Sequence, residues 1–318
     1  MNVGSDRAAI LARVVSFIRL GRPVFLVAGF VLYGLGTAIA AYSGYAIDWR
    51  RFGLGQIAVI ATQLMTHYSN DYFDLEADRA NRTPTRWSGG SRVLSNGELP
   101  RWIALATALV LATIPLCTAM MLLTSSSTGR ISGALLLLAV ALSWEYSAPP
   151  LRLHSSGLGE LAAMVVVTLL VPLIGFSIQA RGLEPLAFVS TAPLCFLQFA
   201  MLMAVEFPDE VGDALVGKRT LVVRLGASRA SVLYVAALAL AYLLLPAWNR
   251  FGLPASVAFA LLLVLPLAVW LGWRVVMWGE HRQPRHWNRL AFGSVSLVTI
   301  AALVELSVYV ELTASSGH

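Results

Sequence analysis

Long apolar stretches, separated by short polar segments, run along almost the whole chain. Each stretch has about the twenty residues that a helix needs to cross the hydrocarbon core of a bilayer. The pattern therefore predicts an all-α polytopic membrane protein. We expect nine transmembrane helices, near residues 23–42, 53–70, 101–124, 131–147, 158–179, 186–206, 229–248, 254–278 and 288–312.

Two features modify this pattern. Pro172 and Pro208 lie inside or just after apolar stretches and are expected to kink or end their helices. In residues 1–22, four arginines (Arg7, Arg13, Arg19 and Arg22) alternate with apolar side chains. This alternation predicts a helix that lies along the membrane surface with its arginines toward lipid headgroups.

The composition supports the membrane class. Of 318 residues, 58% are hydrophobic and 13% are charged, and the mean hydropathy is +0.72. A soluble protein would carry about a quarter charged residues. Cys117 and Cys195 both lie in apolar stretches, so neither a disulfide framework nor a cysteine metal site is indicated. Lipid is the expected environment, and no nucleic-acid partner is expected.

The basic residues predict the orientation, because they are enriched in cytoplasmic loops. Of the 23 basic residues, 18 fall on the side of the N-terminus, and five fall on the other side, at Arg50, Arg51, Arg130, Arg181 and Arg250. We therefore expect a cytoplasmic N-terminus, a cytoplasmic mouth for any site built from the acidic loops, and a location in the plasma membrane.

The spans are interpreted as one integral-membrane domain, 1–318. Residues 23–147 and 158–278 form two pseudo-repeats, each with a long acidic loop after its second helix. The helix at 288–312 is an addition to the two repeats.

The first acidic loop begins Asn70-Asp71-Tyr72-Phe73-Asp74 and continues to Asp78. If one helix continues through it, Asp71, Asp74 and Asp78 share a face at spacing i, i+3, i+7. Like charges at this spacing repel, so a cation is expected between them. Oxygen ligands without histidine or cysteine favour Mg²⁺, with Mn²⁺ or Ca²⁺ as alternatives, over zinc.

The same spacing recurs at Glu206, Asp209 and Asp213, again where an apolar stretch ends. A single cluster of this kind is also what a solvated helix end looks like. Two such clusters on one side of the membrane instead indicate a site that binds a diphosphate through bridging metal ions.

Basic residues follow both clusters, and a diphosphate needs such groups for the oxygens that metals do not bind. The alternative is that these residues only set the topology. A loop with two prolines, 146–152, closes the fourth span, and its extended turn would let Tyr146 and Arg152 point at the cytoplasmic mouth. The alternative is that Tyr146 is an interfacial anchor. The candidate diphosphate ligands are Arg79, Arg82, Arg86, Tyr146, Arg152, Lys218 and Arg219.

Polar residues also extend from the clusters into the apolar stretches. Gln63 and His67 continue the line of the first cluster, and Gln198 precedes the second. Polar side chains at bilayer depth are costly and usually face a cavity or another helix. For His67, a hydrogen bond between helices is the preferred interpretation, and a contact with substrate is the alternative.

These motifs resemble those of the UbiA superfamily of intramembrane aromatic prenyltransferases. Asn70-Asp71-x-x-Asp74-x-x-x-Asp78 is similar to the first aspartate-rich motif of the family, and Tyr146–Arg152 to its tyrosine loop. Glu206–Asp213, followed by Gly217-Lys218-Arg219-Thr220, resembles its second motif. The likeness extends from Arg22 to Gly226. Val205 departs from it, because the second motif usually begins with asparagine.

The resemblance implies nine helices around a central cavity, a lateral opening to lipid, and Mg²⁺-bound isoprenyl diphosphate at the cytoplasmic mouth. It assigns Asn70, Asp74 and Asp78 to one metal and Asp209 and Asp213 to another. Asp71 and Glu206 would support the metal and phosphate network. The implied catalytic residues are Asp74, Asp78, Asp209, Asp213 and Lys218, and Arg22, Gln63, His67 and Gln198 would line the cavity for the acceptor.

The function expected from these observations is transfer of a prenyl chain from an isoprenyl diphosphate to an aromatic acceptor. The Gly217–Thr220 segment and the 148–150 loop most resemble the branch that acts on 1,4-dihydroxy-2-naphthoate in menaquinone synthesis. Hydroxybenzoate, homogentisate and chlorophyllide remain alternative acceptors. A membrane terpene cyclase and a cation transporter are the alternatives from other classes, although acidic clusters on one side only disfavour transport.

Overall fold

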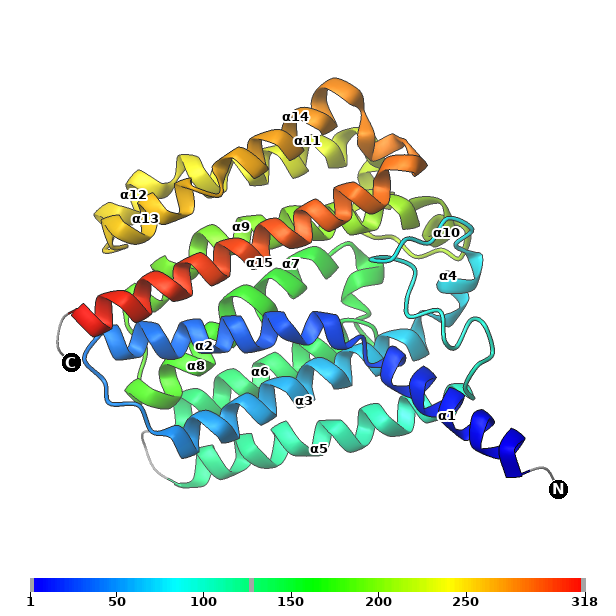
Figure 1. Ribbon diagram of the computed structural model, residues 1–318, viewed down its shortest axis with the longest axis horizontal. Coiled ribbons are helices and arrows are strands. Elements are labelled where there is room, and N and C mark those ends of the chain that lie inside the picture. Colours follow the sequence, from blue (N-terminus) through cyan, green and yellow to red (C-terminus); the bar gives the residue numbers. More distant parts are fainter. Residues whose placement is uncertain (1–2, 126–128, 316–318) are drawn as a thin grey trace.

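The computed structural model describes residues 3–125 and 129–315, and all regular structure in these ranges is helical. The prediction of an all-α fold is confirmed. The longer helices, except the first, run side by side along one axis of the molecule (Figure 1). They are α1 (Val3–Leu20), α2 (Leu26–Tyr42), α3 (Trp49–Phe73), α5 (Arg101–Ser125), α6 (Arg130–Glu145), α8 (Val171–Ala180), α9 (Pro185–Glu206), α11 (Leu221–Leu243), α14 (Leu265–Trp278) and α15 (Pro284–Ser315).

Helical segments occupy the positions of all nine predicted spans, but not all of them have the properties of a membrane span. Within the described ranges, six helices are long and apolar enough to cross a bilayer, and a seventh is added if the bent pair α13 (Ala255–Leu262) and α14 is one span. This establishes a multi-pass membrane protein. The count of nine remains a prediction.

The two segments that fall short do so for different reasons. Helix α6 has only 16 residues. Helix α3 has 25 residues, enough to cross a bilayer, but it carries polar side chains such as Gln63, His67 and Asn70. Those three residues line the interior cavity described below, which explains why an inward-facing helix is less apolar than its lipid-facing neighbours.

Close helix packing depends on small residues. Helices α2 and α8 pack together, and Gly36 of α2 touches the backbone of Pro172. A Cβ atom at Gly36 would lie 1.8 Å from the Pro172 carbonyl oxygen, and one at Gly175 would lie 2.3 Å from the Tyr33 carbonyl oxygen. The two glycines therefore set the distance between these helices, as small residues do in membrane bundles.

The predicted helix end at Pro208 is confirmed, whereas a kink at Pro172 remains a prediction. Pro172 follows a π-helical stretch, Val165–Leu170, that separates α7 (Gly159–Met164) from α8. Pro208 lies in a 3-10 turn, Phe207–Asp209, directly after α9 ends at Glu206.

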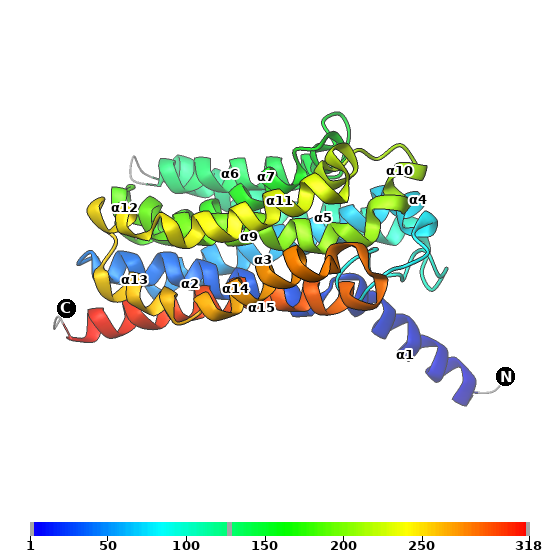
Figure 2. The ribbon, with the colours of Figure 1, turned by 90° about the horizontal axis from the view of Figure 1, so that it is seen from above.

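Both acidic motifs lie at the same end of the bundle. The short helices α4 (Leu75–Ala80) and α10 (Glu210–Leu215) are neighbours there, whereas α12 (Leu245–Arg250) and α13 lie at the opposite end (Figures 1 and 2). Helix α1 projects away from the bundle at the end that bears the motifs. The interfacial position of α1 and the division into two pseudo-repeats remain predictions.

Candidate active site

A cavity of about 310 Å³ lies inside the bundle and reaches the end that carries the acidic motifs. Its inner part is apolar, with walls from α3, α6, the π-helical stretch, α9 and α15. Its outer part is polar. The predicted residues that line it are Arg22, Gln63, His67, Asn70, Asp74, Asp78, Tyr146, Gln198, Glu206, Asp209, Asp213 and Lys218.

Asp74 is the centre of the polar part. It caps the end of α3, where its N–H donates to the Asn70 carbonyl oxygen at 2.8 Å. Its Oδ2 accepts hydrogen bonds from Lys218 Nζ at 3.1 Å and from Asn70 Nδ2 at 2.9 Å. Its Oδ1 accepts from His154 Nε2 at 2.7 Å. Burial disfavours the charged carboxylate, but His154 and Lys218 outweigh this effect and lower the pKa of Asp74 well below its usual range.

Lys218 connects the two motifs. Besides Asp74, its Nζ lies 3.5 Å from Asp213 Oδ2, and its N–H donates to the Asp213 carbonyl oxygen at 2.9 Å. Burial would lower the pKa of Lys218, but the carboxylates around it, led by Asp74 and Asp213, raise the pKa above its usual value. The lone lysine of the chain is therefore a charged group held between carboxylates from both motifs.

Asp78 lacks such a cation at its carboxylate. Burial and the charges of Asp71 and Asp74 raise the pKa of Asp78 to about 8. The loop after α4 approaches it closely, since a Cβ atom at Gly90 would lie 2.0 Å from Asp78 Oδ2. Arg22 and Lys218 act in the opposite direction but do not outweigh this effect, so a further cation beside Asp78 would favour its charged form.

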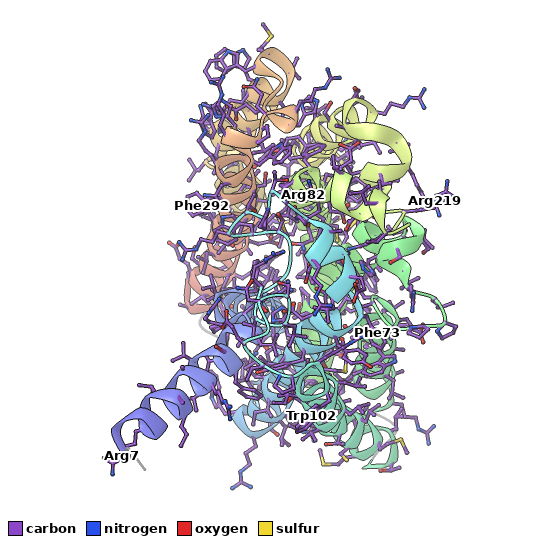
Figure 3. All side chains as sticks on the ribbon, turned by 90° about the vertical axis from the view of Figure 1, so that its right-hand side faces the viewer. Arg7, Phe73, Arg82, Trp102, Arg219 and Phe292 are labelled. Carbon is purple, nitrogen blue, oxygen red and sulfur yellow. The ribbon has the colours of Figure 1, made fainter. Side chains whose placement is uncertain are left out.

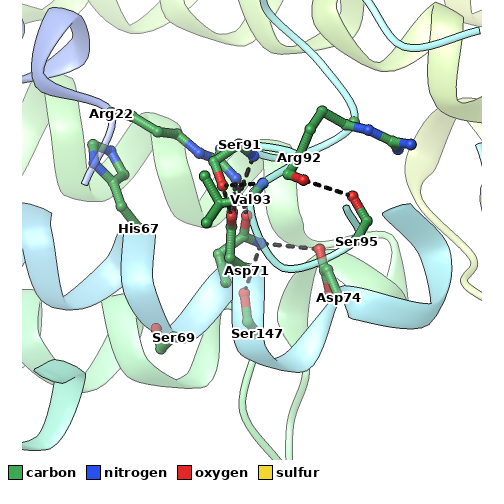
Figure 4. Close-up of polar contacts among 12 residues, drawn as sticks. Arg22, His67, Ser69, Asp71, Asp74, Ser91, Arg92, Val93, Ser95 and Ser147 are labelled. Atoms are coloured by element: carbon green, nitrogen blue, oxygen red, sulfur yellow. Dashed lines mark hydrogen bonds and ion pairs between the residues drawn. The ribbon is translucent and has the colours of Figure 1, made fainter. Parts of the chain in front are cut away.

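Asp71 does not share the cavity face of Asp74 and Asp78. Helix α3 ends at Phe73, so the single helix that would align the three aspartates is broken at Asp74. Asp71 is buried, and its carboxylate accepts from the Arg22 guanidinium and from the Ser91 hydroxyl and N–H, as Figure 4 shows. Arg22 also donates to Asn70 Oδ1 at 3.2 Å, so Asp71 fixes the position of a cavity arginine.

The second motif is held by the loop that follows the first. Asp209 Oδ1 accepts from Asn81 Nδ2 at 2.6 Å, and its Oδ2 accepts from the Gly89 N–H at 3.1 Å. Glu206 is the last residue of α9 and lies beside Glu160. Its buried Oε2 has no hydrogen-bond partner among the described residues.

Three polar residues of α3 and α9 line the cavity deeper in the bundle than the acidic motifs. His67 Nδ1 donates to the Gly21 carbonyl oxygen at 2.7 Å, so Nδ1 carries the proton. Gln63 Nε2 donates to the Phe25 carbonyl oxygen at 2.7 Å. Both side chains bind the segment before α2 and also line the cavity, so the two interpretations of His67 are compatible. Gln198 lines the cavity from α9.

Five predicted diphosphate ligands are not brought to the cavity. Arg79 contacts Glu76 at 3.4 Å on the outer side of α4. The side chain of Arg219 points away from the bundle in Figure 3. All five are solvent-exposed in this structure: Arg79, Arg82, Arg86, Arg152 and Arg219.

Several cavity residues were not expected from the sequence. His154 stacks on Tyr146 with ring centroids 5.1 Å apart, and its Nδ1 donates to the Tyr146 carbonyl oxygen at 2.7 Å. Phe25 and Trp87 meet edge-to-face at 5.8 Å in the cavity wall. Asn81, as described, binds Asp209. Of these residues, only His154 had a signal in the sequence, because it closely follows the tyrosine loop.

The polar end of the cavity has the donor chemistry of a Mg²⁺ site, because carboxylate and amide oxygens dominate it. As arranged here, Lys218 and His154 occupy the oxygens of Asp74. Within the described ranges, no three acidic, histidine or cysteine side chains are close enough together to hold a metal ion. Of the predicted metal ligands, Asn70, Asp74, Asp78, Glu206, Asp209 and Asp213 line the cavity and remain candidates, whereas Asp71 is bound by Arg22 and Ser91 outside it.

Fold and site together define a membrane-embedded enzyme, with carboxylates and a lysine at the mouth of an apolar cavity. Residues 27–296 match the profile of the UbiA prenyltransferase family, so the chain belongs to this family and is a prenyltransferase.

Two relatives in bacteria have a named activity. The chain is 26% identical over 225 residues to 1,4-dihydroxy-2-naphthoate octaprenyltransferase of Bacillus subtilis, a match covering 71% of this chain and 70% of the relative. It is 25% identical over 266 residues to the enzyme of the same name from Escherichia coli, covering 81% and 84%.

Solved structures share the fold. A UbiA homologue from Archaeoglobus fulgidus, bound to DMAPP and Mg²⁺, superposes with a TM-score of 0.65 at 16% identity, covering 92% of this chain and 99% of that one. A homologue from Aeropyrum pernix gives 0.60 at 18% identity, covering 85% and 96%. The predicted family and class of enzyme are confirmed.

Proposed function

We propose that the protein transfers a prenyl chain from a Mg²⁺-bound isoprenyl diphosphate to 1,4-dihydroxy-2-naphthoate, in menaquinone-type quinone synthesis. The observation that carries this proposal is the position of Lys218 between Asp74 and Asp213, where both motifs meet at the mouth of an apolar cavity. The two bacterial relatives named above support the choice of acceptor.

The diphosphate would bind at the polar end, with its prenyl chain along the apolar walls. Mg²⁺, when bound by the carboxylates, supplies positive charge that stabilises the leaving diphosphate. Lys218 would donate hydrogen bonds to the diphosphate oxygens. To do so, its Nζ would either break its contact with Asp74 or donate to Asp74 and the diphosphate at the same time. Mn²⁺ is an alternative metal.

The rest of the cavity would protect and position the reactants. Valine, leucine and isoleucine side chains exclude water from the allylic cation formed as the C1–O bond breaks. The ring faces of Tyr146, Phe25 and Trp87 would stabilise that cation. Arg22, Gln63, His67 and Gln198 would bind the polar groups of the acceptor. A ring carbon of the acceptor would then attack C1 and lose the group it carries, a proton or its carboxyl group as carbon dioxide, which restores the aromatic ring.

The same proposal includes the orientation of the protein. The end with the acidic motifs would face the cytoplasm, because most basic residues gather at that end. The bundle would lie in the plasma membrane. The exposed apolar side chains of α1 would lie in the membrane surface next to the mouth.

The test is product identification by mass spectrometry with purified protein, Mg²⁺ and geranyl diphosphate. Dihydroxynaphthoate, hydroxybenzoate, homogentisate and chlorophyllide are offered separately, and one reaction has no acceptor. The proposal is supported if dihydroxynaphthoate gives a prenylated product and the other three acceptors do not. A prenylated product from another acceptor reassigns the substrate, and a cyclised hydrocarbon without acceptor indicates a terpene cyclase.

A further inference from the structure

A second recess, of about 620 Å³, lies on the outside of the bundle at the end with the acidic motifs. It is formed where α1, α4, the start of α5 and the loop before α5 meet. Arg13, Arg79 and Arg101 line it from these three helices, together with Glu98 and Trp102. None of these five residues lines the central cavity.

The recess has an excess of positive charge. Its three arginines face one carboxylate, Glu98, which is already bound by the Ser16 hydroxyl at 2.6 Å and by Arg19 at 3.0 Å. These contacts join α1 to the loop before α5 and leave little of the Glu98 charge for the recess.

The three arginines retain donors for a ligand. Arg13 makes no side-chain hydrogen bond or ion pair among the described residues. The guanidinium carbon of Arg101 lies 4.2 Å from the centroid of the Tyr72 ring, and Arg101 makes no side-chain hydrogen bond or ion pair among the described residues, so its N–H donors are available. Arg79 has an exposed pair with Glu76 at 3.4 Å, and pairs of this kind are weak. Guanidinium groups from three elements around one recess suit a phosphate group.

The recess also lies at the level of the membrane surface. Arg101 is the first residue of the candidate span Arg101–Thr124. Trp102, labelled in Figure 3, is 67% exposed, as tryptophans of the interfacial belt are. On the adjoining helix α1, Ile10 and Leu11 are 62% and 65% exposed and offer an apolar surface for acyl chains.

We infer that this recess binds the headgroup of an anionic phospholipid, with the phosphate between Arg13, Arg79 and Arg101. The bound lipid fixes α1 against the start of α5, next to the loop that carries Gly90 of the cavity wall and Ser91, which binds Asp71. Arg79 is thereby a lipid ligand on the outer face of α4 rather than a ligand of the substrate diphosphate.

The test is native mass spectrometry of the full-length protein released from detergent micelles, with phosphatidylglycerol or zwitterionic phosphatidylcholine added. We expect one retained phosphatidylglycerol and no retained phosphatidylcholine. The triple variant Arg13→Gln, Arg79→Gln, Arg101→Gln should bind phosphatidylglycerol at least roughly tenfold more weakly, because each arginine near an anionic lipid contributes on the order of fivefold.

The matched control is Arg229→Gln, Arg282→Gln, Arg285→Gln, which removes three exposed arginines from the same end of the protein. It should retain phosphatidylglycerol. If the triple variant fails to fold, the single change Arg13→Glu tests the same point, because Arg13 is exposed and without a protein partner. Its control is Arg7→Glu, also exposed on α1 but outside the recess.

Three results would overturn the inference. They are equal retention of the two lipids by the wild type, undiminished phosphatidylglycerol binding by the recess variants, and displacement of the lipid by a large excess of inorganic phosphate. The last result would make the recess a site for free phosphate.

Discussion

Lys218 and Asp74 form an ion pair across 144 positions of sequence, with Lys218 Nζ 3.1 Å from Asp74 Oδ2. Asp74 ends the first acidic motif's helix, and Lys218 follows the second motif. The pair therefore makes one site from two halves of the chain, and it gives the only lysine among 23 basic residues a defined place.

Changing Lys218 should affect the diphosphate more than the acceptor. We expect Lys218→Ala to lower kcat/KM for the prenyl diphosphate by roughly 30-fold or more, because removing one partner of a buried charge pair costs on the order of 2–5 kcal/mol. The KM for the acceptor should change less. Lys218→Arg should lose most of the activity, since a planar guanidinium needs bidentate room that a compact ammonium does not. Steady-state kinetics with each substrate varied measure both effects.

The control for the conservative exchange is Arg229→Lys, at an exposed position at the same end of the bundle. It should leave the kinetic constants unchanged. Unchanged constants in Lys218→Arg as well would mean that Lys218 contributes only to membrane topology.

Activity should depend on a divalent metal with oxygen ligands. Chelation with EDTA should abolish turnover, and Mg²⁺ or Mn²⁺ should restore it, because the carboxylates at the cavity mouth repel one another and the diphosphate. Circular dichroism should show that the helices persist in EDTA. Full turnover in the chelator would rule out a metal-bound diphosphate.

Each acidic motif should be required by itself. Asp74→Ala and Asp209→Ala should reduce turnover to background while the protein remains folded, and Glu206→Ala should have a milder effect. The matched control is Glu76→Ala, because the Glu76 side chain is 70% exposed on the same short helix that carries Asp78. Wild-type rates in either aspartate variant would remove that motif from the site.

The approach of Gly90 to Asp78 gives a steric prediction. Gly90 and Gly97 both have a φ angle of +73°, so alanine is strained at either position. Only at Gly90 does the new Cβ atom meet Asp78, at 2.0 Å, whereas Gly97 has nothing within 4 Å. Gly90→Ala should therefore lose most of its turnover and Gly97→Ala should keep it. Equal rates would show that the loop does not position Asp78.

Hydropathy predicted the positions of the helices well, because lipid-facing segments must be apolar. It could not predict where they break. The π-helical stretch Val165–Leu170 has an ordinary apolar sequence. The end of α3 at Phe73 falls inside the first acidic motif, whose three aspartates would share a face only if one helix continued through it. That end separates Asp71 from the cavity that Asp74 and Asp78 line.

The carboxylates that line the cavity could be picked out from the sequence, because clustered like charges at the end of an apolar stretch repel one another unless they bind a cation. Their partners were not predictable in the same way. Asn81 and His154 are single polar residues in polar loops, and they meet Asp209 and Asp74 only through the tertiary fold. The charge of a residue also does not show which way its side chain points. The sequence therefore placed Arg79 and Arg219 at the end with the acidic motifs, but it could not show that their side chains face solvent and not the cavity.

The central claim is that both motifs build one diphosphate site, and Mg²⁺-dependent binding tests it most directly. Isothermal titration calorimetry with a non-reactive geranyl thiodiphosphate is carried out on the wild type, Asp74→Asn, Asp209→Asn and the double variant. One shared site predicts that each single change removes most of the binding and that the double variant is little worse than the weaker single variant. Binding losses that simply add, or full affinity in either single variant, would contradict the account.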